Sequence, residues 1–101
     1  MAIVVSHLGP DFEALARAAL RQLPLADVVE LRLDLIGDPG EERLRSFVQA
    51  AKKPVIVSVH GAESQGAFAG SVDEHCAILQ SAARAGCAFV DVDWSLALEL
   101  G

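Results

Sequence analysis

Four short runs rich in β-branched residues, separated by segments long enough for a helix, constrain this sequence more than any other feature. The runs cover residues 2–6, 27–35, 54–59 and 88–94, and their composition is typical of strands. Strands joined by helix-length connections pair in parallel through right-handed crossovers. The sequence therefore predicts an α/β fold in which four parallel strands alternate with three helices.

The three connecting segments each carry helix start and stop signals. Each predicted helix begins near an acidic residue, a proline or a capping serine. Each ends near a proline, a lysine pair or a glycine. The signals are Gly9-Pro10-Asp11 to Pro24, the turn cluster 37–40 to Lys52-Lys53, and the capping box Ser71–Glu74 to Gly86. The apolar stripes predicted to face the core are Phe12, Leu15, Ala16, Ala19, Leu20 and Leu23, then Leu44, Phe47, Val48 and Ala51, then Val72, Cys76, Leu79 and Ala83.

Composition narrows the class of protein. The chain has 101 residues, enough for one small domain, and 52% of them are apolar. The net charge of −6 argues against a nucleic-acid partner, and no apolar run approaches the length of a membrane helix. Residues 1–6 lack the pattern of a signal peptide, and Cys76 and Cys87 are expected to be small buried thiols in a reducing compartment, so we expect a cytoplasmic protein. A mean hydropathy of +0.38 is high for so small a domain and suggests that something outside this chain covers it.

Polar side chains gather near the carboxyl ends of the predicted strands, the edge that carries the active site in parallel α/β folds. They are Ser6, Glu30, Arg32, Asp34, Ser58, His60, Asp91 and Asp93. The second strand has one apolar and one charged face, which suits a barrel with helices outside better than a sheet covered on both faces. Because such a barrel needs eight strands, residues 1–101 are predicted to form half of a TIM-type (β/α)8 barrel.

Several of these residues have a plainer interpretation. The charged set around Arg32 is also typical of the solvated face of an edge strand, and Asp91 and Asp93 could cap a following helix. His60 and His7 could be loop histidines, His75 is expected at the surface, and Trp94 is expected to pack. The glycine-rich stretch 61–70 is a weak phosphate signal because it has no Walker lysine.

The motifs resemble those of a known family. Glu30-Leu31-Arg32-Leu33-Asp34 resembles the Glu-x-Arg-x-Asp strand of type I 3-dehydroquinate dehydratases, and the loop 60–71 resembles their Arg-Pro-x-x-Glu-Gly-Gly-x-Phe-x-Gly-Ser loop. Residues 89–93 resemble the fourth strand of the family, and residues 3–6 resemble its first. The resemblance covers the whole chain in order.

This resemblance implies a (β/α)8 barrel that converts 3-dehydroquinate to 3-dehydroshikimate in the shikimate pathway, a carbon–oxygen lyase reaction. A lysine forms a Schiff base with the substrate, a histidine moves protons, and no metal or cofactor takes part. By resemblance Glu30 and Arg32 hold the ring hydroxyls, Ser6 contacts substrate, and Asp34 braces Arg32. Asp91 and Asp93 are expected behind these groups. His60 stands where the family has its loop arginine and is expected to bind substrate as well.

The sequence departs from the family at its catalytic parts. His60 replaces an arginine, Ser64 a glutamate and Gln65 a glycine, and a histidine cannot supply the bidentate fork of a guanidinium. The only lysines, Lys52 and Lys53, precede the third predicted strand. They are therefore expected at the amino-terminal ends of the strands, opposite the polar cluster. The chain is therefore predicted to contain no catalytic residue and to supply substrate-binding groups only.

Three hypotheses follow. The chain is the N-terminal half of a dehydratase that needs its C-terminal half for chemistry. Alternatively, it is a non-catalytic half-barrel that closes by forming a homodimer through its open strand edges. A third possibility is a small doubly wound α/β domain that binds an anion.

Overall fold

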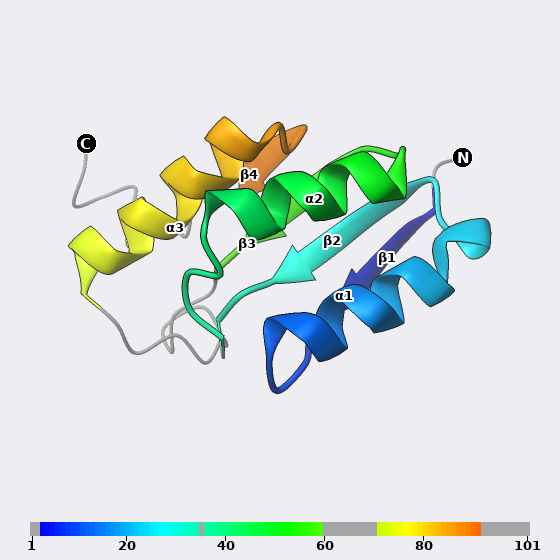
Figure 1. The fold of residues 1–101 in the computed structure, drawn as a ribbon, viewed down its shortest axis with the longest axis horizontal. Coiled ribbons are helices and arrows are strands. Elements are labelled where there is room, and N and C mark those ends of the chain that lie inside the picture. The colour runs from blue at the N-terminus through cyan, green and yellow to red at the C-terminus, as the bar shows by residue number, and fades with distance from the viewer. Residues whose placement is uncertain (1–2, 35, 60–70, 92–101) are drawn as a thin grey trace.

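The computed structural model describes residues 3–34, 36–59 and 71–91. Strands and helices alternate along them in the predicted order, with one extra turn of 3₁₀ helix (Figure 1). The elements are β1 (Val4–His7), α1 (Phe12–Arg21), η1 (Leu23–Leu25), β2 (Val28–Arg32), α2 (Glu41–Ala51), β3 (Val55–Ser58), α3 (Val72–Ala85) and β4 (Phe89–Asp91).

The four strands form one parallel sheet in the order β1-β2-β3-β4. The strand β2 therefore lies between two neighbours, and the interpretation of its charged residues as an edge-strand face is wrong. It is also shorter than the predicted run 27–35. The chain turns after Leu33, whose carbonyl accepts hydrogen bonds from the amides of Ile36 and Gly37 at 3.2 and 3.0 Å.

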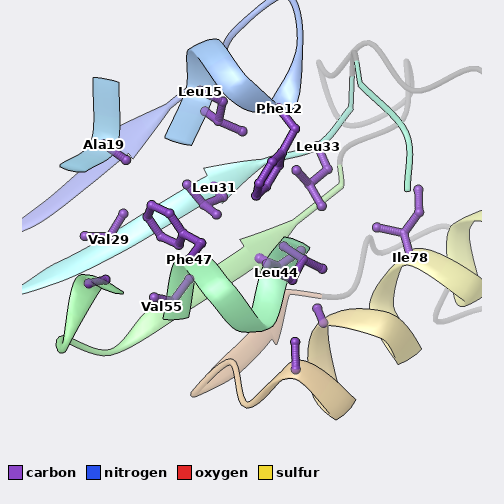
Figure 2. Close-up of a cluster of buried hydrophobic side chains, with 14 of the residues drawn as sticks. Phe12, Leu15, Ala19, Val29, Leu31, Leu33, Leu44, Phe47, Val55 and Ile78 are labelled. Carbon is purple, nitrogen blue, oxygen red and sulfur yellow. The ribbon is translucent and has the colours of Figure 1, made fainter. Parts of the chain in front are cut away.

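All three helices lie over one face of the sheet (Figure 1). Figure 2 shows the core between them, where Leu31 of β2 and Val55 of β3 meet Phe12, Leu44 and Phe47 from the helices. The doubly wound alternative is wrong for the described residues, because it needs helices on both faces. A parallel sheet with helices on one side is the arrangement expected of part of a TIM-type barrel.

Residues of two predicted helix-start signals act as caps, one in the predicted capping box and one at Asp11, which was expected only to face the helix dipole. The Asp11 side chain accepts a hydrogen bond from the Ala14 amide at 2.8 Å, and Ser71 and Glu74 form a reciprocal capping box. Gly86 ends α3 in the left-handed conformation, with φ of 95°, which a glycine adopts without strain. Local sequence chemistry thus fixes these helix ends.

The core-facing side of α3 differs from the predicted stripe. Ala83 is exposed and Cys76 only half-buried, whereas His75 is buried. The expectation of a surface histidine is therefore wrong. The helix has small or apolar residues on most of its circumference, so their periodicity does not fix which side faces the sheet.

His7 also differs from expectation. It lies within β1, not in a loop, and shares the helix-covered side of the strand with Val5. Only 7% of it is exposed, and this burial lowers its pKa. His7 therefore belongs to the core and not to the polar edge.

Candidate functional site

The face of the sheet that carries no helix changes from apolar to polar along the strands. Because side chains alternate along a strand, this open face is formed by every second residue. Its described members are Val4 and Ser6 of β1, Val28, Glu30 and Arg32 of β2, and Ile56 and Ser58 of β3. The strand register pairs Val4 with Val28, two residues before the pair of Ser6 and Glu30 on the same face. The polar residues thus lie together toward the carboxyl ends of the strands.

Glu30 lies at the centre of this polar cluster. Ser6 Oγ donates a hydrogen bond to its Oε1, and Ser58 Oγ donates one to its Oε2 at 2.9 Å. The two serines come from the strands on either side of β2, so the carboxylate is bound from both directions. Such charge-assisted hydrogen bonds are among the stronger ones in proteins.

Arg32 follows Glu30 on the same face and forms an ion pair with Asp34. The Arg32 side chain is 25% exposed, whereas that of Asp34 is 1% exposed. The Arg32 Nε is buried and has no hydrogen-bond partner among the described residues. The guanidinium therefore keeps donor capacity beyond its bond to Asp34.

The arrangement suits recognition of a small molecule with several hydroxyl or carboxylate oxygens. Glu30 can accept hydrogen bonds from hydroxyl groups, and Arg32 can donate to oxygens two residues further along the strand. Among the described residues no three His, Cys, Asp or Glu side chains lie close enough to hold a metal ion. The described residues of the cluster thus supply both acceptors and donors with which a ligand can be bound and oriented.

The two lysines lie away from this cluster. Lys53 Nζ donates hydrogen bonds to the carbonyls of Leu23 and of Ala26, the second at 2.6 Å, beside the start of β2. Lys52 caps α2 in the left-handed conformation, with φ of 56°. Neither amine is near the carboxyl ends of the strands, so neither can act as a nucleophile there.

The two cysteines do not belong to the polar cluster either. Cys76 and Cys87 are half-buried free thiols that pack against the core. Burial raises the pKa of Cys87 to about 11, so its thiol stays protonated near neutral pH.

The structure brings together some of the predicted site residues. Ser6, Glu30, Arg32 and Asp34 form one cluster, and Asp91 is the register partner of Ser58 in β4. His60 and Asp93 lie outside the described residues, as do Ser64, Gln65 and Trp94.

Sequence reasoning placed Ser58 at the end of its strand but did not include it among the binding residues. The signal that could have found it is the parallel register, which sets the end of β3 beside the charged part of β2.

A groove lies on the helix side of the molecule, away from the polar cluster. It has a volume of about 540 Å³ and lies between α1 and α2, lined by residues of these two helices, with Phe12 and Phe47 among them. No residue of the sheet lines it, so it is separate from the polar cluster.

No described helix is long and apolar enough to cross a membrane.

Comparisons with known proteins agree with the sequence motifs. A family model described as type I 3-dehydroquinase matches residues 3–100. A 3-dehydroquinate dehydratase of Methanothermobacter thermautotrophicus is 36% identical over 74 residues, which is 73% of this chain and 33% of the relative. One from Desulfotalea psychrophila is 33% identical over 91 residues, which is 90% of this chain and 38% of the relative. The chain thus spans about a third of the length of these curated relatives.

Proposed function

Because this chain belongs to the type I 3-dehydroquinase family, we propose that it forms one wall of the substrate site of a 3-dehydroquinate dehydratase. In this role Glu30, Arg32 and Ser6 bind the hydroxyl groups of 3-dehydroquinate, and Asp34 braces Arg32. The observation that carries the proposal is the Glu30 carboxylate, which is bound by serines of both neighbouring strands and followed by Arg32 on the same face.

In this proposal the Schiff-base lysine and the proton-transferring histidine come from a C-terminal half. The positions of Lys52 and Lys53 support this division, since both lie near the amino-terminal ends of the strands, opposite the polar cluster. An imine forms only where a deprotonated amine reaches the substrate carbonyl. The chain alone then binds substrate and catalyses no dehydration, and the complete assembly is an eight-stranded barrel that uses no metal or cofactor.

Complementation tests the proposal. The chain is co-expressed with a C-terminal half of a family member that carries the lysine, and formation of the conjugated product is followed by ultraviolet absorbance. We expect activity, a borohydride-trapped imine on the partner half, and loss of at least about 100-fold in activity with Arg32→Met. The control is Arg17→Met, which changes an exposed arginine on α1. Failure of the wild-type pair to dehydrate 3-dehydroquinate, with both halves folded, would refute the proposal.

A second candidate is a non-catalytic half-barrel that pairs with a second copy of itself. It is favoured by apolar exposure at the start of β1, where Val4 is 52% exposed and the preceding Ile3 53% exposed, beside a strand edge that pairs with no other described strand. Unpaired strand edges recruit further strands, and two copies related by a two-fold axis would supply eight. Sedimentation of the chain at micromolar concentration distinguishes the candidates, because a monomer excludes the self-paired form.

A further inference from the structure

The two hydroxyls that bind Glu30 differ in their access to solvent. Ser6 is exposed on the outer strand β1, whereas Ser58 is 0% exposed on β3. We infer that Ser58 is a positioning residue, which holds Oε2 of Glu30 so that Oε1 faces the ligand. This inference rests on the proposed function of the polar cluster and assigns different tasks to its two serines.

The backbone around Ser58 is fixed from both sides. Its carbonyl accepts a hydrogen bond from the Leu33 amide at 2.9 Å, and its register partners are Arg32 in β2 and Asp91 in β4. A buried hydroxyl has no water to which it could transfer its hydrogen bond, so breaking the bond to Oε2 would leave the Ser58 hydroxyl without a partner. The Ser58–Glu30 bond therefore persists when a ligand binds.

Ser6 can exchange its partner instead. A hydroxyl both donates and accepts, and an exposed one rotates at little cost. When a ligand hydroxyl approaches Glu30, Ser6 can release Oε1 and bind the ligand itself. One oxygen of Glu30 is then free for the ligand while the other stays attached to Ser58.

The benefit of this division is preorganisation. A glutamate side chain has several rotatable bonds, and ordering it during binding reduces affinity. Ser58 fixes the side chain before the ligand arrives, so that cost falls on folding and not on binding.

Two measurements on the 101-residue chain test the inference. Three-bond couplings of the Glu30 side chain report whether it occupies one rotamer, and titration with 3-dehydroquinate in the same NMR samples reports affinity. We expect Ser58→Ala to average the Glu30 rotamers and to weaken binding by about 10-fold, the usual effect of losing a hydrogen bond to a charged group. We expect Ser6→Ala to weaken binding but to leave the Glu30 rotamer unchanged.

The matched control is Ser81→Ala. Ser81 Oγ also donates to a carboxylate, that of Asp38 at 3.1 Å, but it lies on α3 away from the open face. This variant should change neither the Glu30 couplings nor the affinity. Amide spectra of all variants confirm that the fold is kept.

The possible results separate the two claims. A single Glu30 rotamer in Ser58→Ala overturns the inference and leaves the proposed function standing. Wild-type chain that binds no 3-dehydroquinate counts against the proposed function, while the couplings still decide the role of Ser58.

Discussion

Removing either partner of the Arg32–Asp34 ion pair should destabilise the chain, and the two losses should differ. The Asp34 side chain is 1% exposed, whereas that of Arg32 is 25% exposed. In Arg32→Met the buried carboxylate of Asp34 loses its ion pair with Arg32, whereas in Asp34→Asn the guanidinium stays charged but can still reach water. The first variant should therefore lose more stability than the second.

The expected magnitudes follow from this burial. Breaking a buried ion pair by removing one of its two charges costs about 3 kcal/mol, and losing a hydrogen bond to a partly exposed charged group costs about 1.5 kcal/mol. The double variant Arg32→Met/Asp34→Asn removes both charges of the pair, so we expect a loss of about 2.5 kcal/mol. The two single losses together exceed the double loss by about 2 kcal/mol, within the usual range for directly contacting residues.

Urea denaturation followed by far-ultraviolet circular dichroism measures all four proteins. At equal slopes, differences in midpoint give differences in the free energy of unfolding. Exposed Arg17→Met serves as the control and should shift stability by less than about 0.5 kcal/mol. Additive single losses, or a larger loss for Asp34→Asn than for Arg32→Met, would refute the argument from burial.

Three further predictions concern residues away from the polar cluster. Burial lowers the pKa of His7 below its ordinary value of 6.5, so the folded state binds its proton less readily than the unfolded state. The contribution of neutral His7 to the free energy of unfolding is therefore fully present above about pH 6.5 and declines as the pH falls from there through the lowered pKa. Urea midpoints between about pH 7 and 5.5 should show this decline in stability, and the decline should be smaller in His7→Gln. Lys53→Met removes two hydrogen bonds to main-chain carbonyls and should cost about 2 kcal/mol in the same assay, while Lys52→Met, at an exposed position, should cost under about 0.5 kcal/mol. With a pKa of about 11, Cys87 in a Cys76→Ser background should react with a thiol reagent at pH 8 about 100-fold more slowly than an exposed thiol; equal rates in folded and urea-unfolded protein would contradict this.

The order of the elements and the polar edge could be predicted because local signals and topology agree. Asp11 and the Ser71 capping box act within one helical turn, so sequence alone identifies them. The clustering of Ser6 with Glu30 follows from parallel pairing, which brings strand ends together. These inferences need only the type of each element and the direction of the strands.

The burial of the histidines could not be predicted in the same way. His75 faces the core because α3 packs on the sheet through His75, Ile78, Leu79 and Ala82, a stripe one position away from the predicted one. His7 is buried because β1 continues one residue beyond the predicted strand, onto the helix-covered side. In both cases the local sequence pattern allows more than one set of residues to face the core, and tertiary packing determines which set is buried.

The two proposed functions differ in what covers the open face, which is a C-terminal half in the first and a second copy of the chain in the other. In water the bond of the exposed Ser6 to Glu30 competes with solvent, whereas a covering layer would exclude water and strengthen it. The same layer would bury Val4, which is 52% exposed, and so would gain hydrophobic free energy where the polar cluster gains electrostatic strength. Stability and ligand affinity should therefore rise together when the face is covered. A C-terminal half that stabilised the chain without tightening its binding of 3-dehydroquinate would show that the cover does not close over the polar cluster.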